Sequence, residues 1–386
     1  MTASWKLRSI GSIATVIAGQ SPNGRAYNED GNGLAFHQGK TEFGLRFIGP
    51  PKKWTTEVTK TALPGDILIS VRAPVGPINE TTEAICIGRG LAAIRPHKCC
   101  DKNYLWYALL WLQPSITGKD GAVFPSITRT QIDALEIPLP PIEEQRRIVA
   151  MLDEAFEGLE KAKANSEANL ANSQELFVTS LETTFTSTPS KFRVRALHEV
   201  GNITTGNTPL TSDQTNFGDY IPFITPADFE SGGTLNLRNR GLSEVGASVS
   251  RIVPSGSALM VCIGATIGKA AHTACDIASN QQINALTPVD GLTAEYIYFQ
   301  FIRRYFQNQV IQQAGQATLP IINKTKWSNL AIQVPKDYGD QNNIIAHLRE
   351  IGRSTENCIK QFKMKLTSIE TIKQSLLDKV FSGSIT

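Results

Sequence analysis

The stretch Leu135-Glu136-Ile137-Pro138-Leu139-Pro140 returns later in the chain as Leu330-Ala331-Ile332-Gln333-Val334-Pro335. Three other segments recur in the same order: Gly19-Gln20-Ser21-Pro22 as Gly206-Asn207-Thr208-Pro209, Arg72-Ala73-Pro74-Val75-Gly76 as Gly264-Ala265-Thr266-Ile267-Gly268, and Tyr104-Leu105-Trp106-Tyr107 as Tyr296-Ile297-Tyr298-Phe299. A period of roughly two hundred residues is far longer than the repeats of solenoid proteins. The sequence therefore predicts a tandem duplication with pseudo-two-fold symmetry.

Length and composition predict a soluble globular protein. With 386 residues, of which 41% are hydrophobic and 19% charged, the chain can bury sizeable cores in two to four domains. No stretch approaches about twenty apolar residues, which argues against a membrane span. The apolar run at residues 10–18 has a counterpart in mid-chain, so we expect folded structure there rather than a leader. The six cysteines lack paired spacing, so we expect reduced thiols, no metal site and a cytoplasmic location.

Residues 1–141 and 189–335 have the pattern of two similar α+β domains. Each mixes short β-branched runs, such as residues 66–71 and 258–263, with many Gly and Pro. The copies agree at these strands and share almost no residues in the stretches 23–63 and 210–253. A common framework with divergent loops indicates two related domains that recognise different targets.

Residues 142–188 and 336–386 each predict one long helix. Pro141 and the acidic pair after it suit the start of the first helix. Apolar residues spaced by threes and fours indicate a coiled coil, although the core faces of an ordinary helical domain could give the same pattern. About forty residues correspond to roughly 60 Å of helix. The apolar stripe of the first helix has small and polar residues in its middle, which suggests that helices of other chains pack against it there. We call these inward-facing stripes the seam. The predicted seam consists of Ile148, Leu152, Leu159, Leu176, Leu348, Ile351, Ile359, Phe362, Leu366, Ile369, Leu376 and Val380.

Motifs for catalysis are incomplete. Residues 33–41 and 264–270 resemble phosphate-binding loops, but the spacing of their glycines is wrong by one residue. The chain has no Asn/Asp-Pro-Pro-aromatic turn of the kind that amino-methyltransferases use, and Asp228-x-Glu230 lacks the lysine of a nuclease site. We therefore predict a non-catalytic protein.

The distribution of charge suits a polyanionic partner. Basic residues exceed acidic ones by four in residues 1–141 and by two in residues 189–335, whereas residues 142–188 have an excess of five acidic residues. Positive globular parts are compatible with nucleic acid, but this charge alone does not prove such binding.

Candidate DNA-binding residues lie at corresponding places in the two copies. Amide and hydroxyl groups of the repeated turns, at Gln20, Ser21, Asn207 and Thr208, suit phosphate or base edges, although the turns could equally be framework. Further candidates follow the buried strands, where Arg suits guanine and Gln suits adenine: Arg72, Arg89, Lys269, Gln281 and Gln282. The divergent loops contribute Lys52, Lys53, Arg238 and Arg240, and the segments before the helices contribute Arg129 and Lys324.

Two motifs resemble those of the specificity subunits of type I restriction-modification systems. Residues 138–149 read Pro-Leu-Pro-Pro-Ile-Glu-Glu-Gln-Arg-Arg-Ile-Val, which is similar to the family's connector, and residues 374–383 are similar to its C-terminal signature. The second copy of the connector, residues 334–341, lacks the second Pro and the Glu. That departure concerns the start of the helix rather than the reading of DNA.

The resemblance implies a non-catalytic subunit with two target-recognition domains, each reading half of a split, asymmetric DNA sequence. Its two helices are expected to form an antiparallel coiled coil, which the sequence alone cannot distinguish from a parallel one. The implied partners are double-stranded DNA, two methyltransferase subunits that use S-adenosylmethionine, and restriction endonuclease subunits. No cofactor is expected in this chain. A competing hypothesis is a tandem-domain scaffold that binds proteins through its helices without reading DNA.

Overall fold

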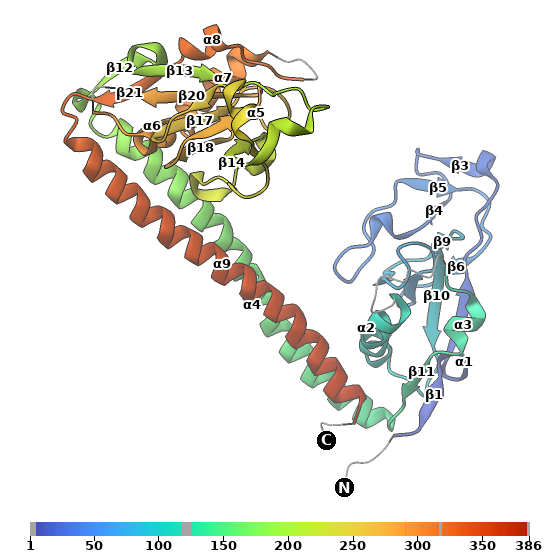
Figure 1. Ribbon diagram of the computed structural model, residues 1–386. Coiled ribbons are helices and arrows are strands. Elements are labelled where there is room, and N and C mark those ends of the chain that lie inside the picture. The colour runs from blue at the N-terminus through green and yellow to red at the C-terminus, as the bar shows by residue number, and fades with distance from the viewer. Residues whose placement is uncertain (1–4, 118–125, 290, 316–318, 384–386) are drawn as a thin grey trace. The chain divides into compact units, whose positions relative to one another are not determined.

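A computed structural model describes residues 5–117, 126–289, 291–315 and 319–383. The chain forms two compact units: unit 1 comprises residues 1–166 and 364–386, and unit 2 comprises residues 167–363. Each unit contains one globular part, one end of helix α4 (Ile142–Thr186) and the opposite end of helix α9 (Asp340–Phe381) (Figure 1). The predicted pair of α+β globular parts and the two long helices are confirmed.

The globular part of unit 1 contains two small sheets. The first is antiparallel, in the order β2 (Ala14–Ala18), β10 (Leu91–Pro96), β7 (Ile67–Ser70) and β8 (Ile78–Glu80). The second has the order β3 (Tyr27–Asn28), β5 (Lys53–Thr55), β4 (Leu34–His37), β9 (Ile85–Ile87) and β6 (Thr61–Ala62), with β4 and β9 parallel. A ribbon pairs β1 (Leu7–Ser9) with β11 (Glu136–Pro138), and the helices are α1 (Ile10–Ile13), α2 (Lys102–Thr117) and α3 (Arg129–Asp133).

Unit 2 repeats the first sheet and the ribbon, and its second sheet has four strands instead of five. Its first sheet has the order β13 (Gly201–Thr205), β20 (Ile283–Pro288), β17 (Ser257–Val261) and β18 (Ala270–Thr273). Its second has the order β15 (Gly241–Leu242), β14 (Phe217–Ile224), β19 (Ile277–Ser279) and β16 (Ile252–Val253), with β14 and β19 parallel. The ribbon pairs β12 (Phe192–Ala196) with β21 (Ala331–Pro335), and the helices are α5 (Glu244–Ser248), α6 (Ala294–Phe301), α7 (Arg304–Ala314) and α8 (Lys324–Ser328).

Strand β7 has three successive apolar residues, Ile67, Leu68 and Ile69, because both of its faces are covered. Ile67 and Ile69 belong to the core that also contains Tyr104 and Leu105 of α2. Leu68 belongs to the core formed with strands of the second sheet. Because successive side chains of a strand point to opposite faces, a strand covered on both faces favours apolar residues at successive positions. In unit 2, β17 divides its residues between two cores in the same way.

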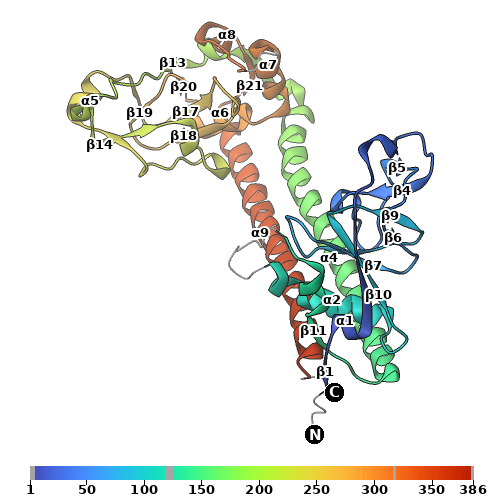
Figure 2. The same ribbon diagram turned by 90° about the vertical axis from the view of Figure 1, so that its right-hand side faces the viewer.

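The ends of α4 and α9 run antiparallel in each unit (Figures 1 and 2). In unit 1, Lys163 of α4 forms a salt bridge of 3.2 Å with Glu370 of α9, and Glu160 pairs with Lys373. Residue numbers thus increase along α4 in the direction in which they decrease along α9, as in an antiparallel pair. In unit 2, Phe177 of α4 lies beside Gly352 of α9. The antiparallel arrangement that the resemblance implied is confirmed.

Most predicted seam residues face inward. Ile148, Leu152, Leu348, Ile369 and Val380 are buried, and Leu159, Ile351, Ile359, Phe362, Leu366 and Leu376 are half-buried. Leu176 is the exception, because 56% of it is exposed, so its prediction as an inward-facing residue is wrong. Buried Leu181 sets the register here: the helical neighbour four residues before it is Phe177, which takes the inward position instead.

A buried glutamine holds the start of each long helix to its globular part. In unit 1, Gln145 accepts a hydrogen bond from the Asp101 amide (2.6 Å) and donates to the carbonyl oxygens of Cys99 and Pro140. In unit 2, Gln341 accepts from the Thr293 amide (3.1 Å) and donates to the carbonyl oxygen of Gly291. These bonds satisfy polar groups that burial would otherwise leave unpaired. The glutamine of the connector motif is therefore structural.

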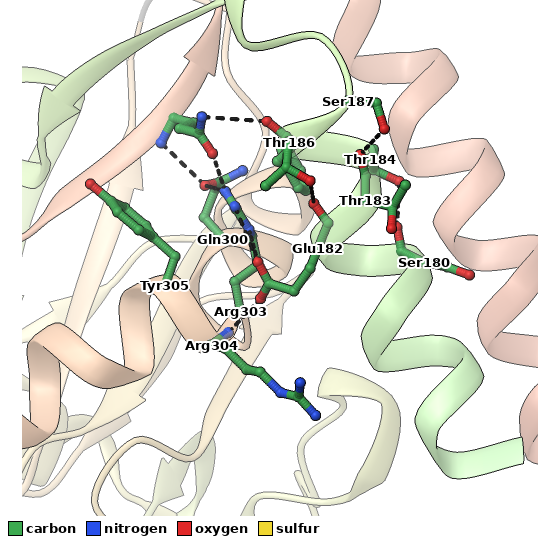
Figure 3. A network of polar contacts seen from close by, with 12 residues as sticks. Ser180, Glu182, Thr183, Thr184, Thr186, Ser187, Gln300, Arg303, Arg304 and Tyr305 are labelled. Carbon is green, nitrogen blue, oxygen red and sulfur yellow. Dashed lines mark hydrogen bonds and ion pairs between the residues drawn. The ribbon is translucent and has the colours of Figure 1, made fainter. Parts of the chain in front are cut away.

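An acidic residue holds the end of α4 within unit 2. The Arg303 side chain, only 2% exposed, donates to Glu182 from two nitrogens and also contacts Gln300 (Figure 3). Glu182 also accepts from the Arg304 amide (2.6 Å), and the Arg303 guanidinium lies 4.3 Å from the ring centre of Phe185. Burial lowers the pKa of Arg303, and the Glu182 carboxylate opposes that effect.

The end of α9 is held in unit 1 by different residues at equivalent positions. Trp111 donates to Asp378 (3.0 Å) and stacks on Phe381, whose ring centre is 5.4 Å away. Trp111 thus occupies the place of Arg303, and Asp378 that of Glu182. Each globular part consequently holds the start of one long helix and the end of the other.

We predict that Gln145→Ala destabilises the protein by about 1–3 kcal/mol, because it leaves the Asp101 amide and two buried carbonyls without their partner. Urea unfolding measures this change. The exposed Gln361 of α9 provides the control, and Gln361→Ala should stay within about 0.5 kcal/mol of the wild type. Equal effects of the two substitutions would show that the buried bonds contribute nothing.

Candidate nucleic-acid interface

The repeated turns at Gly19 and Gly206 occupy the same place in their units. The Gly19 amide donates to the carbonyl of Leu91 (2.9 Å), and the Gly206 amide donates to that of Ile283 (3.0 Å). A Cβ at either glycine would overlap carbonyl oxygens of the backbone segment that faces it in the same unit. Glycine is therefore required at the first position of both turns by close backbone approach.

Each repeated turn packs against a second turn, formed by residues 88–91 in unit 1 and 280–283 in unit 2. The Leu91 amide donates to the Gly88 carbonyl (3.0 Å), and the Ile283 amide to the Asn280 carbonyl (3.2 Å). Arg89 and Gln281 hold the same position in these turns, and both are exposed. We call residues 88–91 and 280–283 the presenting turns.

Four predicted residues are brought together at these turns. Ser21 accepts a hydrogen bond from the Arg89 amide (3.3 Å) and donates to the side chain of Gln38 (3.0 Å). Thr208 donates to the side chain of Gln281 (2.8 Å). The structure thus joins Ser21 to Arg89 and Thr208 to Gln281 at corresponding places in the two units.

Gln20 and Asn207 take part in the framework. The carbonyl of Gln20 accepts from the Thr59 hydroxyl, and its side chain is exposed. The Asn207 side chain accepts from the Arg251 amide (2.7 Å) and donates to the Val249 carbonyl (3.0 Å). Arg251 is an exposed cation beside the turn that sequence reasoning missed. The strand register places exposed Lys60 at the equivalent position of unit 1.

Gln282 and Arg72, both predicted to bind DNA after the buried strands, do not lie at equivalent positions of the two units. Gln282 is half-buried and bonds to Asn280 (2.8 Å) and to the carbonyl of Ile263 (3.3 Å), so it supports the turn. Arg72 is exposed and corresponds to Ile263, because both residues form the isolated bridge that follows the buried strand. Lys269, also exposed, immediately precedes β18 and has no lysine or arginine counterpart in unit 1. The sequence aligned Arg72 with Gly264, and the structure shifts this alignment by one residue because unit 2 has one more residue in this loop.

The remaining predicted cations lie on other exposed segments. Lys52 and Lys53 are at the start of β5, and Arg240 stacks on Phe217 at 4.3 Å from the ring centre. The backbone of Arg238 bonds to the Asn236 side chain. Among the described residues, no hydrogen bond joins these four residues to a presenting turn. Arg129 and Lys324 begin the equivalent helices α3 and α8, which Thr128 and Asn323 cap.

A hollow of about 590 Å³ in unit 2 lies between α6 and the long helices, and Phe177, Phe299, Leu348 and Gly352 help to line it. In unit 1 the position of Gly352 is occupied by Phe156, whose ring packs edge-on against Tyr107 at 5.3 Å. The two units therefore differ at a place where their backbones correspond.

The described residues contain no group of three or more His, Cys, Asp or Glu placed to hold a metal ion. No helix within these same ranges is both long and apolar enough to cross a bilayer.

Fold and surface together define a tandem-repeat protein that presents different polar side chains from two matching scaffolds. A family model for the type I restriction modification DNA specificity domain matches residues 3–169 and 189–367. The chain belongs to this family and carries its domain twice.

Curated relatives match parts of the chain. The putative type I restriction enzyme MjaX specificity subunit of Methanocaldococcus jannaschii is 40% identical over 170 residues, which cover 42% of this chain and 40% of that protein. The type I restriction enzyme HindI specificity subunit of Haemophilus influenzae is 28% identical over 207 residues, covering 51% of this chain and 42% of that protein. Each match therefore spans about two-fifths of the relative.

Two solved structures share the fold. A chain described under the complex assembly and conformational transition of the type I R-M system aligns with a TM-score of 0.79 at 19% identity, covering 98% of both chains. The HsdS subunit from Thermoanaerobacter tengcongensis aligns with a TM-score of 0.61 at 20% identity, covering 99% of this chain and 98% of that one.

We predict that Gly206→Ala destabilises unit 2 by about 1–3 kcal/mol, because the new methyl group must displace the carbonyls of Ser279 and Asn280. Chemical denaturation measures the change. Gly24→Ala is the matched control, since a Cβ there meets nothing within 4 Å. Tolerance of Gly206→Ala would mean that the two turns are not in fixed contact.

Proposed function

We propose that this chain is the DNA sequence-recognition subunit of a type I restriction-modification complex acting in the cytoplasm. Each unit binds one half of a split, asymmetric double-stranded target, and the chain performs no catalysis itself. The observation that carries this proposal is the pair of presenting turns, which share one backbone arrangement and expose different side chains. Membership of the specificity-domain family supports the same conclusion.

Affinity and sequence choice come from different groups. Exposed cations such as Lys52, Lys53 and Arg238 contact phosphates, and this contribution falls as the salt concentration rises. Phosphate contacts carry no sequence information, so the choice of target depends on side chains that reach base edges. The presenting turns supply such side chains on a fixed backbone.

The partners in this proposal are two methyltransferase subunits and restriction endonuclease subunits. The methyltransferase subunits bind S-adenosylmethionine and methylate adenine. Two copies of the same helix junction offer two similar docking surfaces, which suits a pair of identical subunits. Met151, Met364 and Ile372, on the helix ends of unit 1, remain 41%, 57% and 46% exposed and provide apolar surface for a partner.

Mapping methylated adenines in the DNA of cells that express the complete system tests the proposal. We expect one bipartite motif with two unlike halves, because the exposed residues of the two units differ. Deleting the gene for this chain should remove the methylation. A system that methylates the same motif without this chain would contradict the proposal.

We further predict that inserting one heptad into both long helices abolishes specific binding to the native site. Seven residues add about 10 Å along a helix, which changes the spacing of the two halves. Footprinting with the methyltransferase subunit measures binding, and circular dichroism checks that the units remain folded. An unchanged footprint and spacing would show that the helices do not set the distance.

A further inference from the structure

We propose that the exposed side chain of each presenting turn reads one base pair, so that Arg89 selects guanine in one half-site and Gln281 selects adenine in the other. This inference rests on the proposed function, because it names the chemistry by which the two units distinguish their targets. It concerns these two positions alone.

The two turns are equivalent by their hydrogen bonds. The Gly88 amide donates to the His37 carbonyl (2.8 Å), and the Asn280 amide donates to the Ile224 carbonyl (3.0 Å). On the other side of the exposed residue, the carbonyl of Gly90 accepts a hydrogen bond from the Val71 amide. The carbonyl of Gln282 accepts one from the Cys262 amide. Residues 89 and 281 therefore leave their scaffolds at the same point.

Each turn presents a single exposed side chain. In unit 1 the neighbours of Arg89 are Gly88 and Gly90, and both pack so closely on Gln38 that a Cβ would meet it. In unit 2 the neighbours of Gln281 are Asn280 and Gln282, whose side chains bond to each other at 2.8 Å. In both units, therefore, the two neighbours of the exposed residue offer no side chain for binding: they are glycines in unit 1 and are hydrogen-bonded to each other in unit 2.

The side chains of Arg89 and Gln281 have hydrogen-bonding groups that match the edges of bases. The Arg89 guanidinium makes no hydrogen bond or ion pair among the described residues, so its donor fork is available for the two acceptors of guanine. The Gln281 amide oxygen accepts one bond from Thr208, which orients it and leaves a lone pair. With its free NH2 group, this amide matches the donor and acceptor of adenine.

The test exchanges the two residues in the full complex. Arg89→Gln is expected to lower use of the native site by about 10- to 100-fold and to change one guanine to adenine in one half of the methylated motif. Gln281→Arg is expected to change one adenine to guanine in the other half only. Adenine-methylation mapping and competition binding against all four bases at each position measure both changes.

Arg8→Gln is the matched control, because Arg8 is also an exposed arginine of unit 1 and lies on the ribbon of β1 and β11, outside the divergent stretch of residues 23–63. It should leave the motif unchanged, and urea unfolding should give wild-type stability for all three variants. A uniform loss of affinity across sequences for Arg89→Gln would identify a phosphate contact and overturn the inference. If both exchange variants keep the native motif, the inference fails while the proposed function stands. If the wild-type complex recognises no motif at all, the proposed function itself fails.

Discussion

Burial of polar groups where the long helices meet the globular parts is the constraint on which the architecture depends. A helix that begins or ends inside a protein core brings backbone and side-chain polar atoms out of water, and each unpaired atom costs free energy. Gln145 and Gln341 meet this need at the helix starts, and Asp378 and Glu182 meet it at the helix ends. Each globular part is thereby fixed to two helix segments by directional bonds as well as by apolar packing.

The two units satisfy this constraint with different chemistry at the helix ends. Trp111 carries no charge, and it joins Asp378 through one hydrogen bond and Phe381 through stacking. Arg303 buries a full charge, so it needs Glu182, Gln300 and the face of Phe185 together. After duplication, the geometry of the junction has therefore been retained while its residues changed. The role of a position in the scaffold constrains it more than the identity of the residue there.

The features that could be predicted from the sequence are those that show as repeated segments or as periodic apolar residues. The duplication, the α+β character, the two long helices and most of the inward-facing residues follow from local patterns. The contacts of Gln145 and Arg303 could not be predicted, because their partners lie far away in the chain and only the fold brings them together. Leu176 was misplaced where the seam becomes polar and its register is ambiguous. At the candidate interface, the contact between Ser21 and Arg89 could not be read from the sequence either, and Gln282, predicted to bind DNA, supports the turn.

The presenting turns separate the framework from the residues that vary. A turn whose neighbours are glycines, or polar side chains bonded to one another, keeps its backbone when its exposed residue changes, because those neighbours and not the exposed side chain hold the turn. The Gln281 side chain makes one hydrogen bond within its unit, to Thr208. Such a position can change its binding chemistry at little cost in stability, since surface substitutions without partners usually have small effects. Buried positions such as Gly206 lack this freedom, because any side chain there displaces a carbonyl. A duplicated scaffold of this design can therefore acquire two unlike surfaces while both copies keep the same fold.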